Sequence, residues 1–303
     1  MNALLERYSA WTGDSAEEIT DYTTRPVMRV NPLRAPKDLI SRLQEKGVEL
    51  EKVPFLQHAY WYTAPFSLGA TEEYLLGYYY LQEAASQLPV IALTQLLDVK
   101  GKTVLDMAAA PGSKTTQLAA EMNNTGTIVA LDDNRKRCAA LGNNLERCGV
   151  ENTFVYVKDA RYAKDLRMTF DGILLDAPCS GNFTQQKNWL NTRQVLDFDR
   201  KQRTQVALLT TGLSLLNEGG VLIYSTCSLE REENEDAVLA ALSKQNTTHS
   251  KQNSADSGQS AASYEIVSLE IHGDTGIDGV GVRLWPHRHG TQGFFVCAIK
   301  RIS

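Results

Sequence analysis

The stretch TVLDMAAAPGSKTTQLAAEM, residues 103–122, decides the fold of this chain. It begins as a short apolar run, passes through a loop of small residues that holds Pro111 and Gly112, and ends with the composition of a helix. A strand, a tight loop and a helix in this order are typical of the first unit of a doubly wound α/β sheet. The loop lacks both the Walker A spacing and the GxGxxG pattern, so we do not expect it to cradle a pyrophosphate.

The same alternation continues toward the C-terminus. Further strands are predicted at residues 127–132, 153–157, 172–176, 220–226 and 293–300. A long helix before the fourth of these strands has an apolar stripe of Val206, Leu209, Leu213 and Leu216. We therefore predict a mostly parallel sheet with helices on both faces over residues 96–303, preceded by a separate unit over residues 1–95. The polar run at residues 243–263 is predicted to be a flexible surface loop.

Composition limits the class of protein. The chain has 303 residues, of which 43% are hydrophobic and 22% charged, which is ordinary globular usage. No apolar run approaches the roughly 18 residues of a membrane span. The five cysteines are odd in number, widely spaced and without a CxxC pair, which excludes a disulfide scaffold and a zinc ribbon. We expect a cytoplasmic, monomeric protein that has no membrane partner.

Positive charge gathers in three segments, although the net charge is −5. Residues 25–46 hold six bases against two acids, residues 187–203 form a second basic cluster, and residues 283–301 contain no acid. Each cluster alone is typical of a solvated face, but three together favour a groove for the phosphates of a nucleic acid. His287 and His289 lack further ligands at a suitable spacing, so we predict no metal site.

Acids and a cysteine follow the predicted strands, where a parallel sheet binds its ligands. These residues are Asp106, Asp132, Asp159, Asp176 and Cys227. A single acid at such a place is typical of a helix N-cap, but the series indicates a site. Asp132 is placed to bind a ribose diol, and Asp159 could accept a hydrogen bond from an adenine amino group. Because the first loop suits a ligand without phosphates, S-adenosylmethionine fits these demands.

Two cysteines stand beside strands that we expect to be neighbours. Cys179 lies in DAPCSG and Cys227 in STCS, whereas Cys138, Cys148 and Cys297 fall inside a helix or a strand. Free cysteines are commonly inert core residues, and that interpretation remains open for each of the two alone. Carbon 5 of cytosine, however, accepts a methyl group only after a thiolate has added to carbon 6. Asp176 is placed to hold the N3/N4 edge of such a base, and burial would favour its protonated form.

The motifs together resemble a known family. LDMAAAPGSKT, DAPCSG, YSTCSLEREENE and RLWPHRHGTQGFF, with MRVNPLR and YYLQEAASQLP in the N-terminal unit, resemble the RNA 5-methylcytosine methyltransferases of the NOL1/NOP2/Sun group, and within it the archaeal tRNA enzymes. The resemblance implies a Rossmann-like methyltransferase fold with a seven-stranded, mostly parallel sheet. It also implies a small α+β N-terminal domain that resembles an RNA-recognition module.

The resemblance also implies roles for individual residues. Cys227 would be the nucleophile, Cys179 would promote proton removal and release, Asp176 would grip the cytosine, and Lys114 would lie beside them. The residues implied to bind S-adenosylmethionine are Ala108, Ala109, Ala110, Pro111, Gly112, Ser113, Lys114, Asp132, Arg137, Asp159 and Asp176. Two departures affect the RNA contacts: Gln292 replaces a usual acid, and residues 182–189 lack a common basic pair.

We therefore expect an S-adenosylmethionine-dependent RNA (cytosine-5)-methyltransferase that acts on tRNA, with rRNA as the alternative substrate. A methyltransferase for exocyclic amines is a second interpretation, but its usual Asn/Asp-Pro-Pro-Tyr/Phe motif does not match APCS. A non-catalytic RNA-binding or assembly factor with the same fold is a third, against which Cys179, Cys227 and Asp176 argue.

Overall fold

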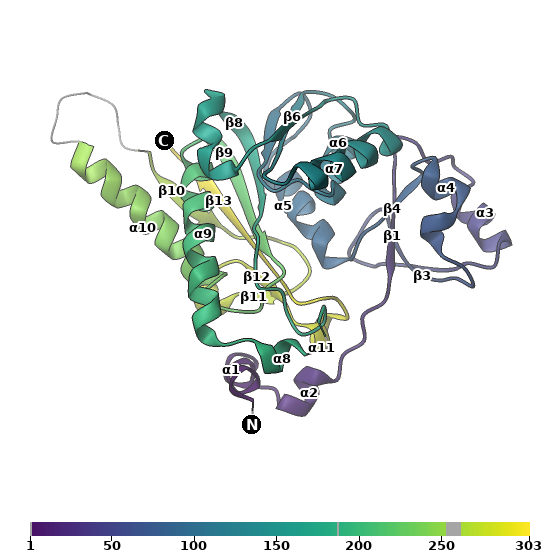
Figure 1. Cartoon of the computed structure of the whole chain (residues 1–303), viewed down its shortest axis with the longest axis horizontal. Coiled ribbons are helices and arrows are strands. Elements are labelled where there is room, and N and C mark those ends of the chain that lie inside the picture. The colour runs from purple at the N-terminus through teal and green to yellow at the C-terminus, as the bar shows by residue number, and fades with distance from the viewer. Residues whose placement is uncertain (1, 187, 253–261) are drawn as a thin grey trace.

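A nine-stranded sheet forms the centre of the molecule (Figure 1). The computed structural model describes residues 2–186, 188–252 and 262–303. The strands run in the order β11-β12-β13-β9-β8-β5-β6-β7, and β10 pairs with β13. Their bounds are β5 Thr103–Asp106, β6 Thr127–Asp132, β7 Thr153–Val157, β8 Phe170–Asp176, β9 Leu216–Thr226, β10 Tyr264–Val267, β11 Asp274–Thr275, β12 Val282–Leu284 and β13 Phe294–Arg301.

The sheet is larger and more mixed than the seven-stranded, mostly parallel one that we expected. Strands β9, β8, β5, β6 and β7 are parallel to their neighbours, as the alternation of strands and helices predicted. Beyond β9 every pairing is antiparallel. Short connections join β11 to β12 and β12 to β13, whereas α10 and three strands lie between β9 and β13 along the chain. The Rossmann-like fold is confirmed, and the correction concerns its C-terminal half.

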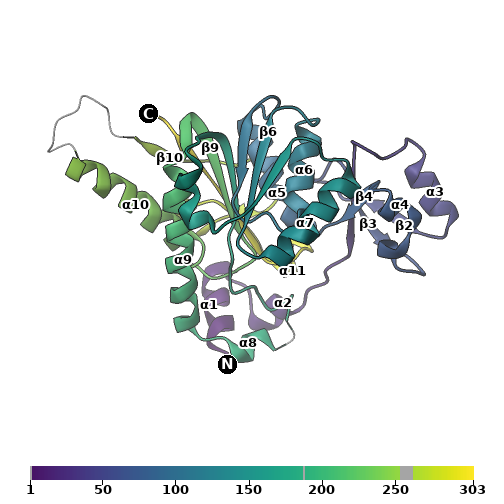
Figure 2. The same cartoon turned by 45° about the horizontal axis from the view of Figure 1, so that its top comes forward.

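Helices cover both faces of the sheet, because successive strand residues point to opposite sides. On β6, Ile128 belongs to the buried cluster that holds residues of α5 and α6, whereas Val129 and Leu131 belong to the cluster that holds residues of η3, α9 and α10. Figure 2 shows these two helical layers on either side of the strands. The covering elements are α5 Leu88–Leu96, α6 Ser113–Glu121 and α7 Arg135–Cys148 on one face, and η3 Ala160–Leu166, α9 Val195–Leu213 and α10 Glu235–Gln252 on the other.

Two sequence-based boundaries were wrong. The apolar stripe of α9 ends at Leu213, and Leu216 is instead the buried first residue of β9. A leucine fits either element, so its spacing could not mark the change. The polar run expected to be a loop from residue 243 begins as the last part of α10, which extends to Gln252. Residues 253–261 of that run lie outside the described residues.

The N-terminal unit is a small α+β domain, as expected. Its four strands pair antiparallel in the order β2-β3-β1-β4, and two short helices accompany them. The bounds are β1 Val27–Val30, α3 Leu39–Glu45, β2 Glu49–Lys52, β3 Ala59–Thr63, η1 Leu68–Ala70, α4 Glu72–Leu75, β4 Tyr79–Leu81 and η2 Ala85–Gln87. Arg29 of β1 is buried and joins this domain to α6, because its Nη2 donates to Thr116 Oγ1 at 2.9 Å.

The first helices pack on the other half of the chain, beside α8 and α11 (Figure 1). Tyr8 and Ile19 share a buried cluster with Phe183, Trp189 and Trp285. Residues 1–95 are therefore not one packing unit, although we predicted them as one domain. The bounds of these elements are α1 Ala3–Thr12, α2 Ala16–Thr20, α8 Trp189–Thr192, η4 Ile277–Gly279 and α11 Pro286–His289.

A buried ion pair ties α10 to β12. Arg283 and Glu235 have side chains 1% and 0% exposed, and Arg283 Nε donates to Glu235 Oε1 at 2.6 Å. We expect Arg283→Met to lower the free energy of unfolding by about 3–5 kcal/mol in urea denaturation, because it leaves Glu235 buried without its counter-charge. Arg42→Met, at the exposed pair with Asp38, should cost less than about 1 kcal/mol. Equal costs would contradict this account.

Candidate active site

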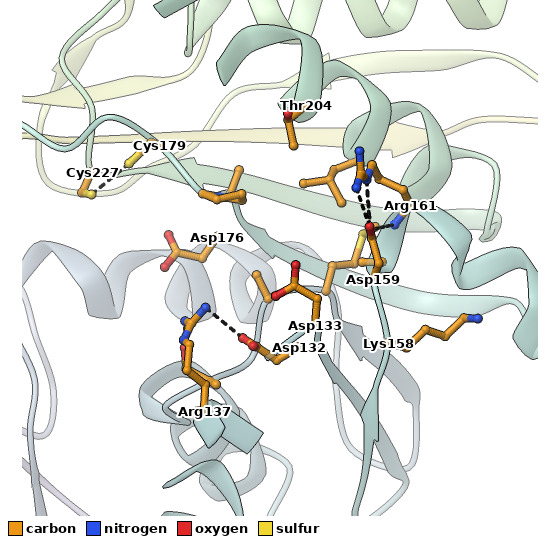
Figure 3. A pocket seen from close by; sticks show the side chains of 17 residues that line it. Asp132, Asp133, Arg137, Lys158, Asp159, Arg161, Asp176, Cys179, Thr204 and Cys227 are labelled. Carbon is orange, nitrogen blue, oxygen red and sulfur yellow. Dashed lines mark hydrogen bonds and ion pairs between the residues drawn. The ribbon is translucent and has the colours of Figure 1, made fainter. Parts of the chain in front are cut away.

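A cavity of about 320 Å³ lies at the carboxyl ends of the parallel strands (Figure 3). It is formed by the segments that follow β5, β6, β7, β8 and β9, together with α9. The lining residues are Met107, Ala108, Ala110, Asp132, Asp133, Arg137, Lys158, Asp159, Ala160, Arg161, Asp176, Ala177, Pro178, Cys179, Thr204, Leu208 and Cys227. Both strand-end thiols and three of the predicted acids therefore open into one space.

The two thiols meet because β8 and β9 are parallel neighbours. Asp176 at the end of β8 pairs with Ser225 of β9, so the segments beyond them leave the sheet side by side. Cys179 and Cys227 lie in these segments, and their Sγ atoms are 3.0 Å apart. Both are free thiols of intermediate exposure. The predicted proximity of the two sulfurs is confirmed.

The hydrogen bond between the thiols makes them unequal. It raises the pKa of Cys179 well above its usual value, and burial and the nearby Glu233 add to this effect. The same bond lowers the pKa of Cys227, because the Cys179 S–H stabilises a negative charge on Cys227 Sγ. Cys227 is thus the thiol that ionises first, and Cys179 is the one that keeps its proton.

Asp176 sits between the thiols and Lys114. Its Oδ2 accepts a hydrogen bond from Lys114 Nζ at 2.7 Å, and its Oδ1 accepts one from Ser225 Oγ at 2.9 Å. The carboxyl is about a third exposed, whereas Lys114 is 8% exposed. Asp176 is thus not fully buried, and two hydrogen-bond donors, one of them cationic, hold its carboxyl group.

The other predicted acids have different surroundings. Asp132 Oδ2 lies 3.2 Å from Arg137 Nη1. Hydrogen bonds from Arg161 lower the pKa of Asp159, and Nη2 of that arginine lies 2.6 Å from Asp159 Oδ2. Asp106 does not line the cavity: burial raises its pKa to about 6, and it accepts a hydrogen bond from Thr115 Oγ1 at 2.7 Å.

The loop after β5 contributes only part of its length to the cavity. Ala108 and Ala110 line it, whereas Ala109 is buried and its N–H donates to the carbonyl of Leu131 at 2.9 Å. Gly112 has φ +107, and a Cβ there would lie 2.9 Å from a Leu141 methyl, so the turn into α6 requires glycine. The remaining predicted loop residues, Pro111, Ser113 and Lys114, are outside the lining, although Lys114 bonds to the lining residue Asp176.

Sequence reasoning missed several lining residues. Asp133 and Arg161 are close to predicted positions, and their place just after β6 and β7 was a signal that could have found them. Thr204 and Leu208, four residues apart on α9, could not be found in this way. They reach the cavity only because α9 packs across the sheet beside it.

The three basic clusters differ in how many of their side chains form ion pairs with acids. Arg25, Arg42 and Lys46 pair with the acids Glu51, Asp38 and Glu73. In the C-terminal cluster, Arg283, His287 and Arg288 pair with the acids Glu235, Asp14 and Asp274, which are distant in sequence. Arg200, Lys201 and Arg203 of α9 are exposed. Within the described residues, exposed bases outside these ion pairs thus remain on α9 and at Arg34 and Lys37, and a groove shared by the three clusters stays a prediction.

The two histidines of the C-terminal cluster have structural partners. His287 Nε2 lies 2.7 Å from Asp14 Oδ2, and the ring of His289 bonds to the backbone of Trp285. Among the described residues, no group of three His, Cys, Asp or Glu side chains is arranged to hold a metal ion. No helix in the same part of the chain is long and apolar enough to cross a membrane.

The fold and the position of the cavity are those of the Rossmann-like methyltransferases. The family model described as 16S rRNA methyltransferase RsmB/F matches residues 93–300, and that of the N-terminal domain of 16S rRNA methyltransferase RsmF matches residues 2–84. The chain belongs to this RsmB/F family of RNA methyltransferases, which confirms the resemblance to the NOL1/NOP2/Sun group.

Individual relatives agree with this family. Ribosomal RNA small subunit methyltransferase F of Shewanella sediminis is 36% identical over 299 residues, which cover 95% of this chain and 60% of the relative. Its namesake from Vibrio atlanticus is 38% identical over 294 residues, covering 92% and 58%. The solved methyltransferase homolog protein from Pyrococcus horikoshii is 36% identical, with a TM-score of 0.77, over 94% of this chain and 88% of the other. The chain thus spans about three fifths of the length of the curated relatives.

The unequal thiols give a measurable prediction. Because the pKa of Cys227 is lowered and that of Cys179 raised, iodoacetamide should modify Cys227 first. The modification rate of each thiol increases with pH, and the increase for Cys227 should occur at a lower pH than that for Cys179. At pH 7 we expect at least a roughly tenfold preference, since one unit of pKa is a factor of ten in thiolate. Peptide mapping by mass spectrometry, with buried Cys297 as the slow reference, measures both rates. Faster modification of Cys179 would contradict the assignment.

Proposed function

We propose that this protein is an S-adenosylmethionine-dependent RNA (cytosine-5)-methyltransferase that acts on the RNA of the small ribosomal subunit. The thiol pair, with Sγ atoms 3.0 Å apart in one cavity with Asp132 and Asp159, carries the proposal for the reaction. The substrate follows from the relatives that bear the name ribosomal RNA small subunit methyltransferase F. Our sequence-based preference for tRNA is therefore replaced by the alternative, rRNA.

The cavity fits the methyl donor. Asp132, held by Arg137 at 3.2 Å, would bind the ribose hydroxyls, and Asp159 would receive the adenine amino group. Ala108 and Ala110 let the backbone approach the ligand closely, because their side chains are small. S-adenosylmethionine supplies an electrophilic methyl group when it is bound. We assign the donor to the part of the cavity between the β5 loop and Asp159, which leaves the thiol end for the base.

Cys227 acts as the nucleophile in this proposal. Its thiolate forms a bond to carbon 6 of cytosine, which gives carbon 5 the electron density of an enamine. Carbon 5 then takes the methyl group. When the proton on carbon 5 leaves, the electrons of its C–H bond re-form the ring double bond, and the C6–S bond breaks to return the Cys227 thiolate. The lowered pKa of Cys227 supports this role, because only a thiolate can begin the cycle.

Asp176 and Lys114 hold the base. The Asp176 carboxylate would accept a hydrogen bond from the exocyclic N4 amine, an interaction that uracil cannot offer. Lys114, 2.7 Å from the same carboxylate, fixes its orientation and is close enough to counter negative charge that develops on the ring. The target cytosine has to leave its stack to reach this pair.

Cys179 removes the proton from carbon 5. Before the reaction, its hydrogen bond to Cys227 raises its pKa, so it is a neutral thiol. Once Cys227 Sγ is bonded to carbon 6, it no longer carries the charge that held the Cys179 proton. Cys179 can then release that proton to solvent, accept the proton from carbon 5 and return to its starting state. The released proton balances the conversion of the sulfonium donor to a thioether.

The start of α9 offers a surface for RNA phosphates. Arg200, Lys201 and Arg203 are exposed there, and Lys201 precedes the cavity-lining Thr204 by about one helical turn. Cations beside the cavity favour the phosphates that flank a flipped base. Two other interpretations are weaker: an exocyclic-amine methyltransferase needs no thiol, and a purely structural factor needs no unequal pair of them.

The two cysteine variants should fail in different ways. Cys227→Ala should abolish methyl transfer and covalent RNA adducts, because no bond to carbon 6 can form. Cys179→Ala should accumulate a covalent protein–RNA complex, because the methylated base cannot lose its proton. Denaturing gels with tritiated methyl donor measure both results. Full activity of Cys227→Ala, or an adduct that persists in the double variant, would contradict these roles.

The substrate is tested by comparing RNA classes from cells with and without the gene. Bisulfite sequencing should find a cytosine that loses its protection in the small-subunit rRNA when the gene is deleted, with tRNA unchanged. The gene encoding Cys227→Ala should fail to restore the mark, whereas the wild-type gene should restore it. Loss of protection in tRNA alone would overturn the choice of substrate and leave the reaction in place.

A further inference from the structure

The segment that follows Cys227 carries a buried acid, Glu233, which lies beside both thiol-bearing segments. Glu233, on the turn between β9 and α10, is 0% exposed, so its carboxylate must find all its partners inside the protein. It accepts a hydrogen bond from the N–H of Ser180 at 3.0 Å and from Ser228 Oγ at 3.2 Å. Ser180 directly follows Cys179, and Ser228 directly follows Cys227. One carboxylate therefore joins both thiol-bearing segments.

A glutamine from α9 completes this arrangement. Gln205 is also fully buried, and its Nε2 donates to Glu233 Oε2 at 2.7 Å and to the carbonyl of Pro178 at 3.1 Å. The segment around Cys179 is thus held on both sides of the cysteine, at Pro178 and at Ser180. Glu233 itself does not line the cavity.

The charge of Glu233 also acts on the pair. It is one of the causes that raise the pKa of Cys179, after the thiol–thiol hydrogen bond and burial. On the other side, Asp176 raises the pKa of Cys227 and Lys114 lowers it. A negative charge behind Cys179 keeps that thiol protonated, so that it donates to Cys227 rather than the reverse.

We propose that Glu233 is a positioning residue that holds the Cys179 and Cys227 segments together and fixes which thiol donates to the other. Its use in catalysis rests on the proposed function, but its effect on the two thiols does not. Hydrogen bonds to a buried charge are among the stronger ones. The loss of this carboxylate should therefore weaken the positioning of both the Cys179 and the Cys227 segment.

Alkylation of the thiols without RNA or methyl donor tests the inference. Glu233→Gln keeps the shape of the side chain and removes its charge. We expect its preference for Cys227 over Cys179 at pH 7 to fall by about tenfold or more, the factor that corresponds to one pKa unit. The pH midpoint for Cys179 should move down and that for Cys227 up. Unchanged midpoints in a folded Glu233→Gln protein would overturn the proposal.

Two further variants keep the test decisive. Gln205→Met removes the amide that joins Glu233 to Pro178 and leaves the charge, so it should shift the midpoints in the same direction by less. Glu230→Gln is the matched control: Glu230 is equally buried three residues earlier, but its carboxylate contacts Tyr8 and Arg7 on α1. A control that shifts as much as Glu233→Gln would overturn the proposal.

The outcome separates the inference from the proposed function. If Glu233→Gln changes the thiols but the wild-type protein methylates no RNA, the positioning role holds and the function fails. If RNA is methylated but the pH midpoints of the two thiols are unchanged in Glu233→Gln, the function holds and the positioning role fails. A retained KM for RNA with a reduced kcat in Glu233→Gln is the result expected when both hold.

Discussion

The parallel pairing of β8 with β9 is the constraint on which the site depends. Its register sets Asp176 beside Ser225, and from that point the two chain segments leave the sheet together. A shift of this register by one residue would turn every side chain of β9 to the other face of the sheet. Cys179 and Cys227 would then no longer meet at 3.0 Å. The thiol pair is thus a product of sheet geometry rather than of either loop alone.

The charges around the two thiols decide which of them donates the hydrogen bond and which accepts it. Lys114 and Asp176 stand on the side of Cys227, and Glu233 stands behind Cys179. An isolated pair of thiols would share its protons evenly, and neither would be a better nucleophile than the other. Here the protein breaks that symmetry before any ligand arrives. A reaction that needs one thiolate and one thiol can use such a pair at neutral pH.

Strand ends were the part of the site that the sequence could predict, because short apolar runs stop at recognisable polar residues. Asp132, Asp159, Asp176, Cys179 and Cys227 all line the predicted cavity. Contacts made by distant residues could not be predicted. The acid-free C-terminal cluster is neutralised by Asp14, Glu235 and Asp274, and Thr204 reaches the cavity through the packing of α9. Leu216 shows the same limit, since apolar spacing alone could not separate the end of a helix from the start of a strand.

The central claim is that Cys227 forms a bond to carbon 6 while Cys179 serves the release of the product. RNA that carries 5-fluorocytosine at the target position tests it most directly, because fluorine cannot leave carbon 5 as a proton does. The account predicts a stable, methylated protein–RNA adduct that mass spectrometry maps to Cys227. An adduct on Cys179, or turnover of the fluorinated RNA with no adduct on Cys227, would contradict it.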